Sequence, residues 1–235
     1  MKQLFIGFCL CTFFWGSAQG FTAEELLDRS IAYHDPNGKW QNFQGEFTVE
    51  METPNRPKRT TNLELDFPKQ RFKSTVTQND ITTSSQLKKG ACTHWYEGST
   101  AFSNEQAKQH QLNCERTTKM RNYYVYLYGL PMKLKDPGTQ LDPKVYNKRL
   151  KGEEYWCIKV NYEETVGKAT WYFYFDKNDY RLRHYQFYHD EAKNDGEYIL
   201  MAEEATVKGI KMPKIRAWYT NGDNRYLGTD VLLLE

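Results

Sequence analysis

The stretch FQGEFTVEMET, residues 43–53, alternates apolar and polar side chains without a break. Phe47 and Val49 would point to one face of a β-strand, because successive side chains of a strand point to opposite faces. Glu46 and Glu50 would point to the other face. One face is therefore expected to pack on a core and the other to meet water, which is typical of an antiparallel sheet.

Similar short segments follow along the chain, separated by turn-forming residues. Because no helices alternate with them, they predict a meandering antiparallel sheet in a mainly β (α+β) fold. KDPGTQLDPK, residues 135–144, is interpreted as a loop. The predicted strands are NLELDF (62–67), RFKSTVT (71–77), YWCIKVNY (155–162), TWYFYF (170–175), RLRHYQFY (181–188), EYILMAEEATV (197–207) and KIRAWYT (214–220).

Two segments carry the start signal of a helix. TAEELLDRSIAYH, residues 22–34, places Thr22 three positions before Glu25, which is the spacing of a capping box. SNEQAKQH repeats this spacing between Ser103 and Gln106. We expect an amphipathic helix at the first position and a helix start at the second.

CERTTKMRNYYVYLYG, residues 114–129, fits either a helix or a strand. A helix over residues 114–128 would have its final glycine at the C′ position and Pro131 just beyond, and this stop signal favours the helix. A strand would instead place Tyr124, Tyr126 and Tyr128 on one face. On the helix, one face would carry Met120, Tyr123, Tyr124 and Leu127.

The N-terminus predicts a signal peptide over residues 1–20. A positive charge in MKQ precedes the apolar run LFIGFCLCTFFW, which is short for a membrane-spanning helix. Cleavage after Ala18 and cleavage after Gly20 both fit the small residues that follow. Cys9 and Cys11 do not follow a small residue, so they do not fit a lipid-attachment motif. The mature protein is expected in the periplasm or outside the cell.

The remaining chain, residues 21–235, is expected to form a single β-rich domain of roughly 215 residues. No stretch of it approaches the length of an apolar membrane span, so it is not expected to cross a membrane. The 32 basic and 30 acidic residues nearly balance, which argues against nucleic acid as a partner. No motif for a cofactor is present, and none is expected.

Three cysteines follow the predicted signal peptide. In an oxidising compartment two would pair, and Cys92 with Cys114 is the candidate disulfide. Cys157 lies at an inward position of YWCIKV and is expected to be a buried thiol. A catalytic cysteine is the alternative, although no residue pattern indicates an activated thiol.

Two dipeptides place a histidine beside an aspartate, His34 with Asp35 and His189 with Asp190. If the two dipeptides met, these side chains would make a cluster of two histidines and two carboxylates that could bind a metal ion. The alternative is that His34 stabilises the C-terminal end of a helix. Neither dipeptide alone forms a site, because adjacent side chains diverge on a strand or helix.

Longer stretches of the sequence resemble known protein families. SIAYHDPNGKW, NYYVYLYGLPMKLKDPGT, TWYFYFD and GEYILMAEEATVKGIKMPKIRAWYTNGDNRYLGTD together resemble a family of exported Bacteroidota proteins, a domain of unknown function. ATVKGIKMPKIRAWY, after WYFYFDKNDYRL, resembles at the level of fold the LolA/LolB-like periplasmic lipoprotein carriers. This resemblance implies a single curled antiparallel sheet or half-open β-barrel, with a few helices covering a concave face that shelters acyl chains. It implies no role for an individual residue.

The aromatic residues of two segments are candidates for lining such a cavity, because tyrosine combines an apolar ring with one polar group. An aromatic core is the alternative. TWYFYF is apolar on both faces, so helices and long loops are expected to cover both, unless one face is an exposed docking patch. The candidate lining residues are Tyr123, Tyr124, Tyr126, Tyr128, Trp171 and Phe173.

Three functions are consistent with these features. The first is a periplasmic binding or carrier protein, without catalysis, for a lipid, an acylated protein or another hydrophobic ligand. The second is an interaction module of the cell envelope whose cavity is filled by its own side chains. The third is a metal-dependent hydrolase, which requires the two histidines to meet.

Overall fold

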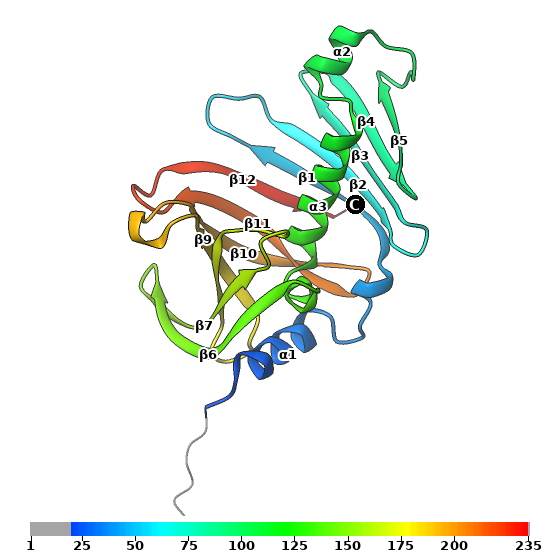
Figure 1. The fold of residues 1–235 in the computed structure, drawn as a ribbon. Helices are drawn as coiled ribbons and strands as arrows, with labels where there is room; N and C mark the ends of the chain where they lie inside the picture. The colour runs from blue at the N-terminus through cyan, green and yellow to red at the C-terminus, as the bar shows by residue number, and fades with distance from the viewer. Residues whose placement is uncertain (1–19, 235) are drawn as a thin grey trace, which may run out of the picture.

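The alternating segments form strands of one twelve-stranded antiparallel sheet (Figure 1). The computed structural model describes residues 20–234, so the predicted signal peptide lies outside the described residues except for Gly20. The strand order is β5-β4-β3-β2-β1-β12-β11-β10-β9-β8-β7-β6, and the sheet curls without closing into a barrel because β5 and β6 remain its edges. The strands are β1 Gln44–Glu52, β2 Arg59–Asp66, β3 Arg71–Gln78, β4 Ile81–Lys88, β5 Ala91–Tyr96, β6 Thr139–Leu150, β7 Glu153–Tyr162, β8 Thr170–Phe175, β9 Leu182–Tyr188, β10 Glu197–Val207, β11 Ile210–Thr220 and β12 Tyr226–Leu233.

Every segment predicted from alternation lies on a strand, and the predicted mainly β fold with a curled sheet is confirmed. The interpretation of residues 135–144 as a loop is wrong, because β6 begins at Thr139. Pro143 lies between Leu141 and Val145, where the register of β6 with β7 shifts. A proline lacks an N–H to donate, so it is tolerated at an irregularity of an edge strand.

Both predicted capping boxes are present. α1, Ala23–His34, begins after Thr22, and its buried side packs on the sheet near β6 and β11. α2, Asn104–Gln109, begins after Ser103. No helix within residues 20–234 has the length and apolar character needed to cross a membrane. The described part of the chain also contains the short 3-10 helices η1 Trp40–Asn42, η2 Met132–Lys135 and η3 Glu191–Lys193.

The tyrosine segment is a helix, α3, Cys114–Gly129, as the stop signal predicted. Gly129 was expected just beyond the helix, at the C′ position. It is instead the last helical residue, and Leu130 is the C-cap. A Cβ on Gly129 would lie 2.3 Å from the ring of Trp40. Glycine is therefore needed here for close packing of η1 against the helix end.

α3 runs along the hollow side of the curved sheet, from α2 toward η2 (Figure 1). The C-terminal half of α3 is packed into the core. The ring of Tyr128 lies 4.6 Å from that of Phe47 on β1, and the ring of Tyr126 lies 5.8 Å from that of Trp171 on β8. Side chains of β1 and β8 thus pack against this end of the helix.

The outer face of β8 was expected to lie under helices or long loops, but neighbouring side chains and the short η3 cover it. Phe173 and Phe175 enter the main core, whereas Tyr172 and Tyr174 form a second apolar cluster with Tyr155 on the outer face. Neighbouring side chains cover this cluster, together with η3, where Tyr172 donates a hydrogen bond to Glu191 (2.6 Å). Tyr155, Tyr172 and Tyr174 are each less than a tenth exposed, so these three rings offer little surface for docking.

Candidate functional site

The six candidate lining residues mostly belong to the filled part of the fold. Tyr128 and Phe173 are fully buried in the main core, and Tyr126 and Trp171 pack against it. Tyr123 is 38% exposed. Tyr124 is the candidate that lines a cavity, so the aromatic-core alternative describes most of this set.

A buried arginine fixes the C-terminal half of α3. Arg216 of β11 is 1% exposed and donates a hydrogen bond to the carbonyl of Leu127 (2.8 Å). Its guanidinium lies over the ring of Tyr128, 4.1 Å from the centroid. Asp230 is the register partner of Arg216 on β12, and burial raises the pKa of its carboxyl to about 7.

The other part of the hollow side, formed by β2, β3 and β4, is not filled. A pocket of about 430 Å³ lies there between α3 and the strands, and we call it the polar pocket. Its floor comes from alternate residues of β3 and β4, which share one face of the sheet. The three opposed pairs of this floor are Ser74 with Ser85, Val76 with Thr83, and Gln78 with Ile81.

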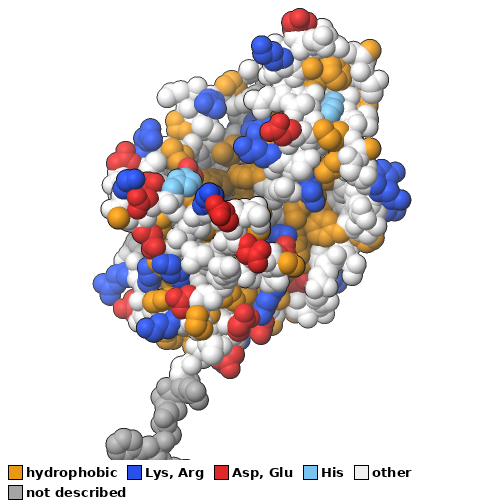
Figure 2. Space-filling view, in the orientation of Figure 1, with side chains coloured by type: hydrophobic (Ala, Val, Ile, Leu, Met, Phe, Trp, Pro, Cys, Tyr) orange, Lys and Arg blue, Asp and Glu red, His pale blue; other side chains and the backbone are white. Residues whose placement is uncertain are grey.

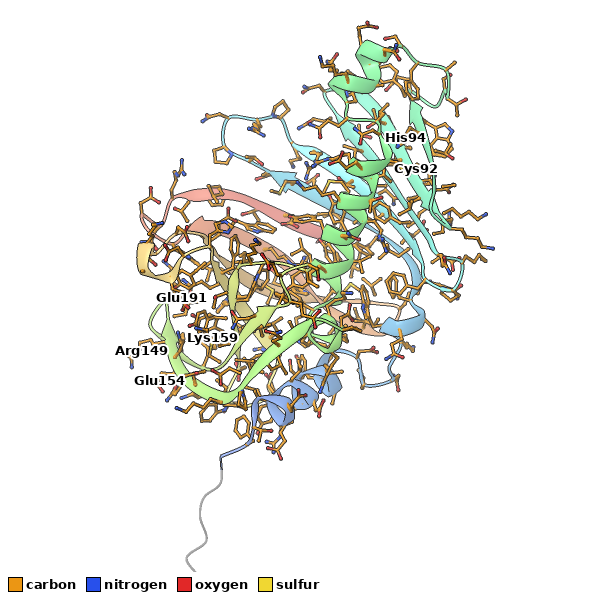
Figure 3. All side chains as sticks on the ribbon, viewed as in Figure 1. Cys92, His94, Arg149, Glu154, Lys159 and Glu191 are labelled. Atoms are coloured by element: carbon orange, nitrogen blue, oxygen red, sulfur yellow. A yellow bond between two sulfur atoms is a disulfide. The ribbon has the colours of Figure 1, made fainter. Side chains whose placement is uncertain are left out.

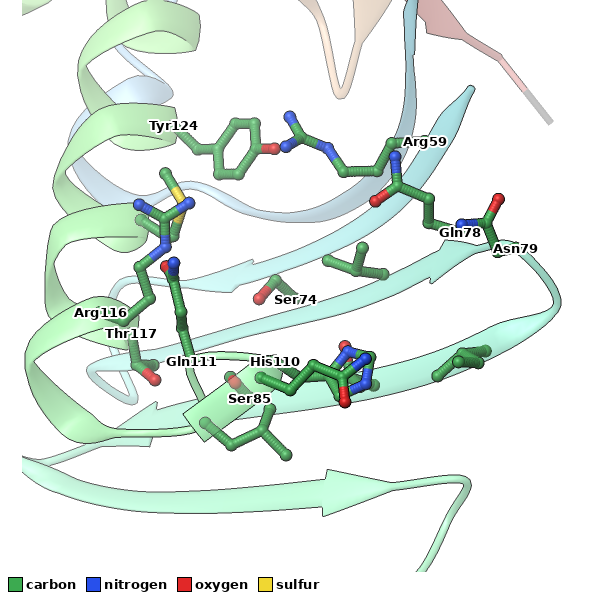
Figure 4. Close-up of a pocket in the computed structure, with 16 residues that line it drawn as sticks. Arg59, Ser74, Gln78, Asn79, Ser85, His110, Gln111, Arg116, Thr117 and Tyr124 are labelled. Atoms are coloured by element: carbon green, nitrogen blue, oxygen red, sulfur yellow. The ribbon is translucent and has the colours of Figure 1, made fainter. Parts of the chain in front are cut away.

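α3 and β2 supply the walls of the polar pocket. Arg116, Met120 and Tyr124 follow one another at helical spacing on α3, and Arg59 stands at the start of β2. Figure 4 shows Tyr124 and the Arg59 guanidinium pointing toward one another, with Arg116 farther along the helix. Among the described residues that line this pocket there is no Asp or Glu.

A second cavity of about 460 Å³ lies along another side of α3, and we call it the apolar groove. Arg121 and Val125 of the helix form one wall. Arg71 also lines the groove, and it is paired with Glu64 at 2.9 Å. The apolar lining residues are Leu65, Phe67, Phe72, Leu87 and Val125.

The two cavities share one continuous sheet face. Phe72 and Leu87 are register partners in the floor of the apolar groove, and two residues along the same strands are Ser74 and Ser85 in the polar pocket. The sheet beneath α3 therefore changes from apolar to polar along its length. Figure 2 shows this side of the molecule hollowed near its centre, with hydrophobic side chains inside and basic ones near the rim.

Two contacts fix the N-terminal half of α3 above β5. Cys92 and Cys114 form a disulfide with their Cα atoms 5.6 Å apart, which is the pair that the sequence indicated. Two residues farther along β5, the ring Nε2 of His94 (Figure 3) lies 3.0 Å from the hydroxyl of Thr117. The helix is thus held at both ends while its sides face the two cavities.

The first His–Asp pair has structural roles. The Nδ1–H of His34 donates to the carbonyl of Lys211 (2.8 Å), and its Nε2 accepts from the N–H of Leu182 (3.0 Å). Burial lowers the pKa of His34, which favours the neutral ring. Asp35 accepts hydrogen bonds from the N–H groups of Lys39 and Trp40, both at 2.8 Å, and so fixes the start of η1.

The second His–Asp pair lies elsewhere. The N–H groups of His189 and Asp190 donate to the carboxylate of Asp195, and Asp190 also accepts from the N–H of Ala192 at the start of η3. Within residues 20–234, no group of three or more His, Cys, Asp or Glu side chains could hold a metal ion. The four residues of the hypothetical cluster are not brought together. Both ring nitrogens of His34 also bond backbone groups.

Cys157 is buried, as expected, among Tyr155, Tyr172 and Tyr174 on the outer face. Burial raises the pKa of its thiol to about 12. The thiol is therefore protonated at neutral pH and is not an activated nucleophile.

The residues that define the two cavities were not among the sequence candidates. One signal was present in RFKSTVTQ, where the inward positions change from Phe72 through Ser74 and Val76 to Gln78. An inward strand face that becomes polar indicates a solvent-filled space or a ligand instead of a core. The contribution of Arg59 and Arg116 depends on how α3 crosses the sheet, which no local pattern encodes.

The curled antiparallel sheet around a helix is a LolA-like fold. The structure is similar to the crystal structure of a LolA superfamily protein from Nitrosomonas europaea, at 10% identity and a TM-score of 0.50, covering 91% of this chain and 92% of that one. It is also similar to a putative outer membrane lipoprotein-sorting protein domain from Vibrio parahaemolyticus, at 12% identity and a TM-score of 0.49, covering 88% of each chain. No curated protein matches the sequence significantly.

The chain belongs to the family of unknown function DUF6503, whose model matches residues 2–235. The fold expected from the distant resemblance to LolA-like proteins is thus confirmed.

Proposed function

We propose that this protein is a periplasmic binding or carrier protein for an amphiphilic ligand, whose apolar part occupies the apolar groove. The observation that carries the proposal is the unfilled groove of about 460 Å³ lined by Leu65, Phe67, Phe72, Leu87 and Val125. Its volume falls within the range of small-molecule sites, about 300–1,000 Å³. A lipid or the acyl chain of an acylated protein has the matching chemistry.

The position of the groove supports this proposal. Its floor is the hollow side of the sheet and its wall is a helix fixed at both ends, so the apolar surface is preformed. Preformed sites avoid the ordering cost that a flexible segment would pay on binding. A periplasmic location accords with the predicted signal peptide and with the Cys92–Cys114 disulfide, which an oxidising compartment favours.

The other two functions have less support. An envelope interaction module was expected to expose aromatic residues on its outer face, yet Tyr172 and Tyr174 are 7% and 3% exposed. A metal-dependent hydrolase was expected to bring His34 and His189 into one cleft. Both nitrogens of His34 instead hold backbone groups.

The proposal is tested by native mass spectrometry with organic extraction on protein purified from the periplasm without detergent. A reproducible bound mass in the lipid range is expected, and apo protein should take up added palmitate. A clean apo mass together with no palmitate uptake would contradict the proposal.

A matched pair of variants locates the ligand. Leu87→Arg places a long charged side chain on the floor of the apolar groove and should weaken palmitate uptake at least about tenfold, because the side chain occupies the space of the acyl chain and puts a charge beside it. Leu233→Arg makes the same change at a 38% exposed position outside both cavities and should leave uptake unchanged. Equal uptake by the two variants would place the ligand elsewhere.

A further inference from the structure

We propose that the polar pocket is a binding site for the phosphate group of a phosphate ester, held between Arg59 of β2 and Arg116 of α3. The two arginines come from different elements and line one pocket whose described lining contains no carboxylate (Figure 4). Such a pocket attracts an anion, because two positive charges share a partly enclosed space.

Both guanidinium groups are free to bind. Within residues 20–234, neither Arg59 nor Arg116 makes a side-chain hydrogen bond or an ion pair, and the Nε of Arg59 is buried without a partner. Arg71 and Lys73 of the neighbouring strand β3, by contrast, both bind Glu64, at 2.9 and 3.0 Å. An unpaired buried donor is costly, so Arg59 favours a ligand that accepts from it.

The nearest buried carboxyl does not cancel this positive charge. Asp230 lies close enough to Arg59 to be affected by its charge, but the larger effect on Asp230 comes from Arg216, its partner across the strands. Arg59 and Arg116 line the pocket with two positive charges, whereas Asp230 is a single carboxyl and is not among the lining residues. A net positive charge therefore remains at the pocket even when Asp230 is ionised.

The neighbouring groups match a phosphate ester better than a simple carboxylate. Guanidinium groups present several donors in a fixed geometry that suits phosphate oxygens, and the hydroxyls of Ser74, Thr83 and Ser85 add more donors from the floor. The cavity of about 430 Å³ also leaves room for a polar body beyond the phosphate. Gln78 and Gln111 line this remaining space and can both donate and accept hydrogen bonds.

The ester has two possible sources, a soluble molecule or the head group of a lipid. The second source rests on the proposed function, because it places the head group in the polar pocket and the chains in the apolar groove. The continuous sheet face from Phe72 to Ser74 joins the two cavities and matches a ligand with an apolar and a polar end.

The test is calorimetric titration of the mature protein with glycerol 3-phosphate and, separately, with dihexanoylphosphatidic acid. Arg59→Gln and Arg116→Gln should each weaken the binding of both probes about tenfold, because each removes a charge-assisted contact. Arg149→Gln is the matched control, since it makes the same charge change at an exposed residue far along the chain. Urea unfolding of each variant verifies that the fold is retained.

The outcomes separate the two proposals. If both arginine variants weaken both probes while Leu87→Arg weakens only the lipid, the phosphate site and the lipid head-group assignment both hold. If glycerol 3-phosphate binds with the same arginine dependence but no lipid binds, the phosphate site holds and the proposed carrier function fails. Failure of the wild-type protein to bind glycerol 3-phosphate, or equal binding by the Arg59, Arg116 and Arg149 variants, would overturn the phosphate site.

Discussion

The two halves of the hollow side use the same helix in opposite ways. In the half formed by β1 and β6–β12, Tyr128 of α3 is fully buried and Arg216 binds the helix backbone. In the half formed by β2–β5, α3 is held by a disulfide and one side-chain contact while cavities remain on its sides. One half is therefore filled around the helix, and the other leaves two cavities beside it.

The difference originates in the inward residues of the strands. β8 contributes Phe173 and Phe175 to the filled half, whereas β4 contributes Thr83 and Ser85 to the open half. Small polar side chains do not fill space or favour dehydration, so a helix above them leaves a cavity. Stability should thus be concentrated in the filled half and binding in the open half.

The largest effect is expected from Arg216→Met. This change leaves the carbonyl of Leu127 without its donor and Asp230 without its main counter-charge, and should lower the free energy of unfolding by up to about 5 kcal/mol. Urea unfolding measures it. Arg225→Met, at an exposed residue of the neighbouring turn, should change stability by less than about 0.5 kcal/mol. Equal losses for the two variants would contradict the role of Arg216.

Truncating one inward side chain in each half compares their packing directly. Phe173→Ala removes a fully buried ring and should cost about 4 kcal/mol in urea unfolding, because it leaves a cavity in a close-packed core. Ile81→Ala removes a half-buried side chain from the floor of the polar pocket and should cost only about 1 kcal/mol. A larger loss at Ile81 than at Phe173 would reverse the comparison.

Acid should destabilise the filled half through His184 of β9. Its Nδ1 accepts from the N–H of Met201 (3.2 Å) and its Nε2–H donates to Tyr155 (3.1 Å), and burial lowers its pKa from 6.5 to about 4. The unfolded chain therefore binds a proton more readily than the folded chain between these values. Stability is fully present above about pH 6.5 and falls as the pH drops to about 4, by about 3 kcal/mol.

The pH effect is measured by urea unfolding across this range. His184→Gln should give a shallower dependence, because glutamine does not titrate. His34 acts in the same direction, since burial also lowers its pKa, so part of the slope should persist in this variant. A His184→Gln protein with the unchanged wild-type slope would contradict the assignment.

The smallest of these effects concerns the fixed helix of the open half. Cys92→Ser with Cys114→Ser opens a loop with a sequence separation of 22 and should cost about 2 to 3 kcal/mol. Amide hydrogen exchange should increase mainly in residues 114–124 of α3, because Arg216 still holds the end of the helix. Equal acceleration along all of α3 would show that the two halves of the helix are not held independently.

The sequence predicted the sheet well because alternation is a local property. The stretch around Phe47 and Val49 fixed the inward face of β1, and Thr22 with Glu25 fixed the start of α1. β4 escaped prediction, since ITTSSQLK has few apolar inward residues. The same small polar side chains, Thr83 and Ser85, form part of the floor of the polar pocket.

The candidate site was harder to predict because it depends on contacts between distant segments. Helical spacing gathers Tyr123, Tyr124 and Leu127 but does not tell which of them faces the sheet, a cavity or solvent. Tyr123 proved exposed and Leu127 buried, and Tyr124 reached the pocket. The partners of His34 could not be predicted for the same reason, because they are backbone groups of β9 and β11.

The most direct test of the division between core and site is NMR of isotope-labelled protein with 16-doxyl-stearic acid, whose spin label broadens nearby signals. We expect the amide signals of Leu65, Leu87 and Val125 around the apolar groove to broaden first, while those of Ile158 and Phe173 stay sharp. Broadening centred on Ile158 and Phe173, or no specific broadening, would contradict the claim that the open half binds the apolar ligand.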